Sequence, residues 1–168
     1  MVAGAKATFL APAAVIAALT LAACAPPVLT DDQKQPDAVR IGMSSRQVES
    51  LMGTSRRTCW IYERGEGVEE GVCFEDGMVH TIGRRTQKPG TNDVSIDAEF
   101  SDAWPPKRRP SPTATEVALG MAPADVARLK GKPSALVEYF SWRGGEYKAT
   151  FRNGALTKFD DVPMPPIP

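Results

Sequence analysis

The chain of 168 residues carries 20 basic and 20 acidic side chains, with 42% apolar and only 7% aromatic residues. A formal net charge of zero excludes the basic face by which duplex-binding proteins neutralise phosphates, so no nucleic-acid partner is expected. A single His leaves little catalytic chemistry, and the length suits one ordinary domain or two very small ones.

Residues 1–23 have the pattern of an export signal. Lys6 is their only charged residue, and the Ala- and Leu-rich run after it has about 17 residues, fewer than the ~20 that span a bilayer. The run ends in Leu-Ala-Ala-Cys, which resembles the lipobox of bacterial lipoproteins. The resemblance implies cleavage between Ala23 and Cys24 and attachment of diacylglycerol and palmitate to Cys24.

Such a lipid anchor implies a periplasmic protein held on a membrane, since several acyl chains exceed what stable anchoring needs. Ala25, not Asp, follows the cysteine, and by resemblance to the enterobacterial sorting rule this implies the outer membrane. Residues 24–37 are polar and contain three prolines, so we expect a tether.

Two cysteines remain once Cys24 carries lipid. An even pair in an oxidising compartment favours a disulfide between Cys59 and Cys73. A catalytic dithiol would prefer a close Cys-x-x-Cys spacing, which this pair lacks.

The chain repeats itself. Residues 38–53 align with residues 116–131 at an offset of 78, with six identities in sixteen positions, and Phe-Glu-Asp-Gly at 74–77 aligns with Phe-Arg-Asn-Gly at 151–154 at an offset of 77. We therefore expect a small domain in duplicate, with one residue lost between helix and sheet in the second copy.

Each copy predicts a short helix followed by a sheet. Ser44 with Gln47 forms a capping-box pattern and Gly53 ends the first helix, while Pro123 begins the second and Gly131 ends it. Helices of about two turns need a sheet to pack against. Alternating apolar residues and two-residue Asp-Gly and Asn-Gly turns predict a three-stranded meander in each copy, over residues 59–64, 71–75, 78–82 and 136–142, 146–152, 155–159.

The register can be predicted as well. The Asp76-Gly77 turn places Phe74 opposite Val79 and Cys73 opposite His80. If Cys59 faces Cys73, one apolar face covers the helix and the disulfide lies on the other face; the apolar face then holds Trp60, Tyr62, Val72, Phe74 and Val79. A shift of 77 sends this face to Val137, Tyr139, Ala149 and Phe151, and the cysteine positions to Leu136 and Thr150.

The expected fold is therefore α+β, with two tandem units at 38–84 and 115–161, each a short helix on a three- to four-stranded antiparallel sheet. A Pro-rich linker at 85–114 separates them, and alternation at 94–100 favours an edge strand within it. The tail at 162–168 is Pro-rich and extended.

The pattern Val-x-Ile-Gly-Met-Ser, a short helix ending in Gly, a Trp-x-Tyr strand and Val-x-Phe-x-x-Gly-x-Val resembles the SmpA/OmlA lipoprotein family. The residues that carry the resemblance are Val39, Ile41, Gly42, Met43, Val48, Leu51, Gly53, Trp60, Tyr62, Val72, Phe74, Gly77 and Val79. It implies a role beside the outer-membrane β-barrel assembly machine. The tandem duplication is also similar to the secreted β-lactamase inhibitory proteins.

Few side chains predict a chemical site. His80 stands without a cluster of metal ligands, so we expect a surface residue and neither a metal nor a cofactor. The basic pairs at 56–57 and 84–85 and the triplet at 107–109 are typical of solvated surface. Trp142, Glu66 and Arg143 lie at predicted hairpin ends and are candidates for partner contacts.

These features favour a non-enzymatic, lipid-anchored module of the outer membrane that binds an envelope protein, in membrane assembly or envelope integrity. The alternative is a tethered inhibitor that inserts hairpin tips, such as residues 65–67 and 143–145, into a periplasmic enzyme.

Overall fold

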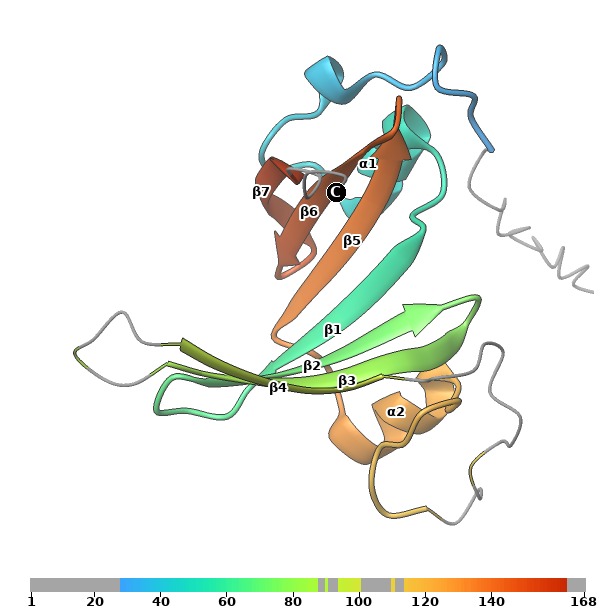
Figure 1. Ribbon diagram of the computed structural model, residues 1–168. Helices are drawn as coiled ribbons and strands as arrows, with labels where there is room; N and C mark the ends of the chain where they lie inside the picture. The colour runs from blue at the N-terminus through green and yellow to red at the C-terminus, as the bar shows by residue number, and fades with distance from the viewer. Residues whose placement is uncertain (1–27, 88–89, 91–93, 101–109, 111–113, 163–168) are drawn as a thin grey trace, which may run out of the picture.

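The computed structural model describes residues 28–87, 90, 94–100, 110 and 114–162. Within these residues the protein is α+β, as the sequence predicts, with two short α-helices and one antiparallel sheet of seven strands (Figure 1). The strands, in the order β4-β3-β2-β1-β5-β6-β7 across the sheet, are β1 Arg57–Glu63, β2 Val68–Glu75, β3 Met78–Gln87, β4 Val94–Phe100, β5 Ala135–Trp142, β6 Gly145–Arg152 and β7 Ala155–Val162.

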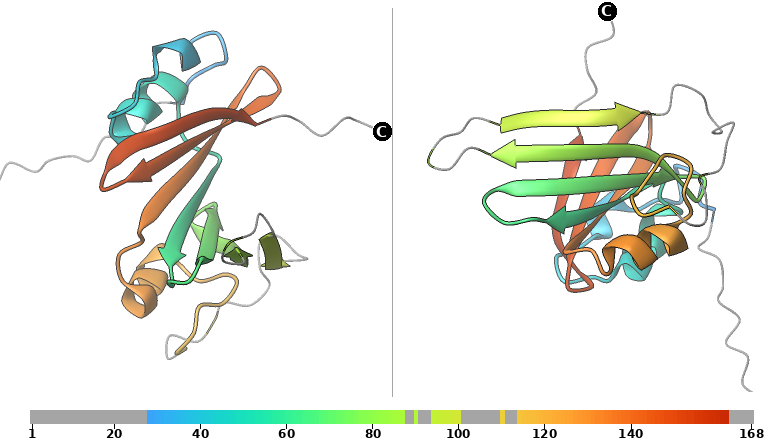
Figure 2. Two further views of the ribbon diagram at one scale, coloured as in Figure 1. Left: turned by 90° about the vertical axis from the view of Figure 1, so that its left-hand side faces the viewer. Right: turned by 90° about the horizontal axis from the view of Figure 1, so that it is seen from below.

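Both predicted meanders form, and the segment at 94–100 is a strand, β4, at the edge beside β3. The three hairpin turns at Asp76-Gly77, Arg143-Gly144 and Asn153-Gly154 all have positive φ at both residues, as this turn type requires. The meanders are joined through β1 and β5 into one continuous sheet, which twists so strongly that β2–β4 run across the direction of β5–β7 (Figure 2).

The junction between the meanders is symmetric. Cys59 pairs with Val137, and these two residues are equivalent at the repeat offset of 78. On either side Thr58 pairs with Glu138 and Trp60 with Leu136. A pseudo-twofold axis therefore passes through the Cys59–Val137 pair and relates the two copies.

The helices begin and end where the sequence predicts. Helix α1 spans Ser45–Met52, with Ser44 and Gln47 in a complete capping box and Gly53 at its C-terminus with φ of 78°. Helix α2 spans Pro123–Lys130 and ends at Gly131, with φ of 74°. A single 3₁₀ turn, η1, covers Pro36–Ala38 ahead of α1.

Each helix covers the meander of the other copy, contrary to the expectation of two self-contained units. Val48 and Met52 of α1 pack in one core with Phe140, Phe151 and Leu156 of the second meander. In the second core, Met121 just before α2 and Val126 within α2 pack on the first meander. The residues of that meander are Tyr62, Val72, Phe74 and Val79. The packed units are therefore composite, α1 with β5–β7 and α2 with β1–β3.

The Gly-Met segment before each helix is hydrogen-bonded through its backbone to the meander that the helix covers. Gly42 N–H donates to the carbonyl of Leu156 at 2.8 Å, and Leu156 N–H donates back to Met43. In the other half Gly120 N–H donates to the carbonyl of Val79 at 2.7 Å, and Val79 N–H donates to Met121. Each Gly-Met pair thus forms a short bridge to the third strand of the opposite meander.

Two register predictions are wrong, and both errors are of one residue. A bulge in β3 at His80 shifts the register, so Cys73 lies opposite Thr81, while Phe74 and Val79 pair as predicted. In the second copy the residue is lost between the first and second strands, because Cys59 and Cys73 correspond to Val137 and Thr150. Val137 and Tyr139 consequently lie on the opposite face from Phe140.

The disulfide between Cys59 and Cys73 is present across β1 and β2, with a sequence separation of 14. Cross-linking a loop of this size constrains the unfolded chain. We expect the Cys59→Ala/Cys73→Ala variant to lose about 3 kcal/mol in free energy of unfolding. Denaturant titration of the variant beside the oxidised chain measures this, and equal midpoints for the two would contradict a stabilising bond.

Candidate functional site

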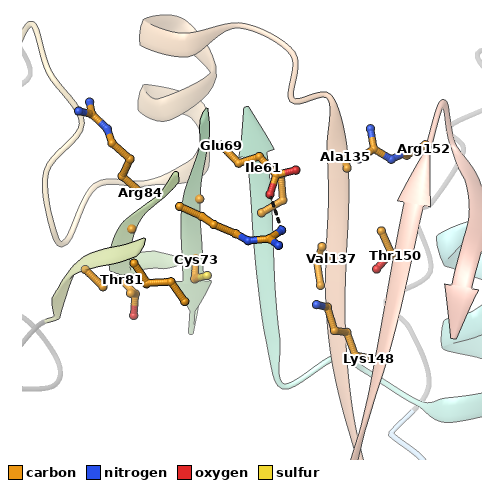
Figure 3. A pocket seen from close by; sticks show the side chains of 15 residues that line it. Ile61, Glu69, Cys73, Thr81, Arg84, Ala135, Val137, Lys148, Thr150 and Arg152 are labelled. Atoms are coloured by element: carbon orange, nitrogen blue, oxygen red, sulfur yellow. Dashed lines mark hydrogen bonds and ion pairs between the residues drawn. The ribbon is translucent and has the colours of Figure 1, made fainter. Parts of the chain in front are cut away.

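The face of the sheet opposite the helices, the helix-free face, is hollowed into a groove of about 450 Å³. The groove runs from β4 across β3, β2, β1 and β5 to β6. Figure 3 shows side chains from these strands around the common space, among them Thr81, Cys73, Ile61, Val137 and Thr150. The strong twist of the sheet makes this face concave.

Two glycines leave the floor of the groove bare. Gly71 on β2 and Gly83 on β3 are directly paired, and neither has a positive φ. A Cβ added at Gly71 would meet its nearest atom, Ile61 Cδ1, at 3.5 Å, and one at Gly83 would meet its nearest atom, the Asp97 carbonyl oxygen, at 3.6 Å. These are ordinary contacts, so neither backbone conformation nor crowding requires glycine here.

Glycine inside a strand destabilises the fold by about 0.5–1 kcal/mol relative to alanine. Two such residues side by side, without a local structural need, keep the backbone of β2 and β3 open to an approaching chain. The surrounding surface is mostly apolar, since Ile61, Ala135 and Val137 lie on one side and Ala98 and Ile96 on the other. Ile96 is 75% exposed.

In the described part of the chain, the charges at the rim are paired except those of Arg84 and Lys148. Arg85 pairs with Glu69 at 3.2 Å and Arg152 with Glu63 at 2.6 Å. Lys148, which lines the groove from β6, has neither an ion pair nor a hydrogen bond among the described residues. The groove therefore offers one available ammonium group beside an apolar, bare-floored surface.

Tyr139 was expected in the core, but it lies on the helix-free face beyond the groove. The Arg57 guanidinium stacks on its ring at 4.1 Å from the centroid and also approaches Glu146 at 3.5 Å. This cation–π pair extends the concave surface along β1 and β5.

Glu138 is the one buried charged residue among the described residues, with 4% exposure. It lies on β5 at the position equivalent to Trp60, facing α1, where its Oε1 accepts a hydrogen bond from Ser45 Oγ at 2.7 Å. Its Oε2 has no hydrogen-bond partner. Burial raises the pKa of Glu138 to about 7, and repulsion from Glu49 on α1 adds to this shift.

Glu138 should make stability depend on pH. A folded-state pKa of about 7 against 4.5 unfolded means that the folded chain binds the proton more tightly, so stability falls as pH rises between these values. We expect Glu138→Gln to be more stable than the parent chain at pH 8, by up to about 3 kcal/mol, and to show little gain at pH 4.

Urea unfolding of both chains across this pH range measures the difference. The exposed-site variant Glu66→Gln is the control and should follow the parent chain. A constant difference between Glu138→Gln and the parent at all pH values would contradict a titrating carboxyl.

A second charged cluster holds α2 to the sheet. The Glu70 carboxylate on β2 accepts hydrogen bonds from Lys130 at the end of α2 and from Arg64. Burial alone would raise the pKa of Glu70, but these two bonds lower it below its usual value. The cluster is structural, since it ties the exchanged helix to the first meander.

The predicted contact residues lie at two separate ends of the sheet. Glu66 occupies the β1–β2 turn, exposed and with φ of 52°. Trp142 and Arg143, at the β5–β6 turn, are engaged by the N-terminal segment: Trp142 Nε1 donates to the Asp31 carbonyl at 3.0 Å and Arg143 N–H to Asp31 Oδ2 at 2.8 Å. The turns do not form one site with the groove.

His80 is half-buried at the β3 bulge, where Nδ1 lies 3.1 Å from Thr81 Oγ1 and Nε2 lies 4.0 Å from Glu75. The described residues contain no cluster of three or more His, Cys, Asp or Glu side chains that could hold a metal. Ala23, Cys24 and the basic triplet at 107–109 lie outside the described residues.

In the part of the chain that the structure covers, neither helix has the length and apolar character needed to cross a bilayer. No protein-family model matches the sequence, and no curated protein matches it either.

The groove, the paired glycines and the orientation of Glu138 could not be identified from the sequence without the strand order, although an unneeded glycine in a predicted strand is a usable signal.

Proposed function

We propose that this protein is an outer-membrane-anchored periplasmic lipoprotein that binds a protein partner and acts as a scaffold in outer-membrane assembly or envelope integrity. The lipobox-like Leu-Ala-Ala-Cys at Cys24 supports the anchor. The disulfide between Cys59 and Cys73 supports an oxidising compartment. The likeness to SmpA/OmlA lipoproteins in the Gly-Met and strand motifs supports the envelope role.

The bare-floored groove is the observation that carries the binding function. Gly71 and Gly83 are not required by the fold, so their effect is to admit foreign backbone close to β2 and β3. The apolar walls desolvate an inserted side chain. Lys148 supplies one charge in the same groove.

These features define the chemistry of the occupant. It is an extended loop or hairpin of a protein that places an apolar side chain over the paired glycines and a carboxylate near Lys148. A carboxylate there gains a charge-assisted hydrogen bond from a group that has no partner among the described residues.

The inhibitor alternative rests on the β1–β2 turn. Glu66 and its flanking Gly65 and Gly67 are exposed and all have positive φ, and the turn is held at its base by the Gln87 N–H, which donates to the Gly67 carbonyl at 2.9 Å. The β5–β6 turn is less suited to insertion into an enzyme, because Asp31 already holds Arg143.

The anchor is tested by metabolic labelling with an alkyne fatty acid. The parent chain should take up the label at Cys24 and fractionate with the outer membrane, whereas Cys24→Ala should take up none. Equal labelling of both chains, or of neither, would overturn the anchor.

The partner role is tested by photocrosslinking in intact cells followed by affinity capture. Recovery of β-barrel assembly components supports the scaffold, and recovery of a soluble periplasmic enzyme supports the inhibitor. A chain recovered without a crosslinked partner contradicts both.

A further inference from the structure

The segment ahead of α1 is bonded to the β5–β6 turn, although the sequence predicts a free tether over residues 24–37. Asp31 Oδ2 accepts a hydrogen bond from the Arg143 backbone N–H at 2.8 Å, and the Asp31 carbonyl accepts one from Trp142 Nε1 at 3.0 Å. The Arg143 guanidinium also lies 3.7 Å from Asp32. Two neighbouring residues of the segment thus hold both residues at the hairpin end.

Two further bonds extend this contact, which we call the N-terminal clamp (residues 30–35). Lys34 Nζ donates to the Ser141 carbonyl at 2.6 Å and pairs with Asp31 at 2.9 Å, and its side chain is only 13% exposed. Gln35 N–H donates to the carbonyl of Leu51 at the end of α1. The clamp therefore joins α1, β5 and the segment into one body.

The clamp shortens the connection to Cys24. Six peptide units separate Cys24 from Thr30, where the clamp begins, and they span about 20 Å at full extension. A free tether over 24–37 would instead allow more than 40 Å by the same measure, roughly the size of a small domain. The attachment point is therefore confined to the neighbourhood of the clamp.

We propose that the clamp orients the protein on a phospholipid surface, with the α1 and β5–β6 end toward the headgroups; this rests on the proposed lipid at Cys24. Arg143, whose side chain is 62% exposed, lies at this end, where its guanidinium stacks on Trp142 and lies 3.7 Å from Asp32. An exposed ion pair of this kind is weak, so the guanidinium can exchange Asp32 for a headgroup phosphate. The β1–β2 turn lies away from this end of the molecule and points away from the membrane (Figure 1). The groove then opens sideways, parallel to the bilayer, toward proteins held in it.

The orientation can be tested on the mature chain, residues 24–168, without depending on cellular lipidation. The disulfide leaves Cys24 as the one free thiol of three, so a maleimide lipid attaches there alone. The ¹⁵N-labelled product is placed in nanodiscs of phosphatidylethanolamine and phosphatidylglycerol that carry a gadolinium-chelating lipid. Relaxation of each amide then reports its distance from the bilayer.

We expect amides at 30–34 and 141–146 to broaden at least three-fold more than those of Glu66 and Gly90. Equal broadening throughout, or stronger broadening at Glu66, would overturn the orientation. Asp31→Ala, at an exposed position, removes the carboxylate contacts of the clamp with Arg143 and Lys34 and should reduce the contrast, while Asp97→Ala on β4 should not. Mass spectrometry of the protein from cells shows separately whether Cys24 carries lipid, so the anchor and the orientation can fail independently.

Discussion

Separated into two fragments, residues 24–105 and 106–168, the chain is expected to fold only when both halves are present. The first fragment holds α1 but not the strands that α1 covers, since Val48 and Met52 pack on Phe140, Phe151 and Leu156. The second holds α2 without its meander. Circular dichroism and sedimentation should show two largely unfolded fragments that form a folded one-to-one complex on mixing.

Cooperative unfolding of the first fragment alone, as a monomer, would contradict the packing of each helix on the meander of the other copy. In that case α1 would lie on its own meander, and contacts of Val48 with Val72 would appear in nuclear Overhauser spectra. The matched comparison is the intact chain, in which Val48 should contact Phe140.

Filling the groove is expected to abolish partner binding without unfolding the protein. Leucine at Gly83 projects from the floor of the groove, where an added Cβ meets only ordinary contacts. We expect Gly83→Leu to reduce crosslinked partner at least ten-fold, while the free energy of unfolding changes by no more than about 1 kcal/mol, because strand glycine contributes little to stability.

The control is Ser50→Leu, which places the same side chain on the exposed side of α1, away from the groove. It should leave the crosslinked partner unchanged. Loss of partner in both variants, or in neither, would contradict binding at the groove.

Local signals in the sequence predicted the elements well. The capping box at Ser44, the left-handed glycines after both helices and the Asp-Gly and Asn-Gly turns each determine backbone conformation within a few residues. The pairing of Cys59 with Cys73 was expected from an even number of cysteines in an oxidising compartment, and the continuous apolar face that this register produces supported it.

The arrangement of helices on the sheet could not be predicted, because the two meanders present similar apolar faces. Periodicity shows that α1 must cover a sheet but not which one, and the residues between Met52 and Arg57 allow α1 to cross to β5–β7. The backbone bridge from Met43 to Leu156 decides the choice, and a bridge between segments more than 100 residues apart leaves no local signal.

The candidate site was predicted least well, because it depends on strand order. Gly71 and Gly83 become neighbours only once β2 and β3 pair to their full length, and the predicted third strand ended at residue 82. The alternation of the strand predicts Glu138 as an exposed polar residue, yet the β1–β5 junction and α1 bury it. Trp142 was expected to be an exposed contact, because the clamp that engages its indole comes from a segment predicted to be a tether.

Site-specific photocrosslinking in intact cells tests the binding function most directly. A photoreactive residue is placed at Thr81 or Thr150 in the groove, or at Ser50 or Ala127 on the exposed sides of the two helices. We expect crosslinks to one partner from both groove positions and none from the helix positions, with the groove crosslinks lost in Gly83→Leu. Crosslinks that arise only from Ser50 and Ala127, or that persist in Gly83→Leu, would contradict binding at the groove.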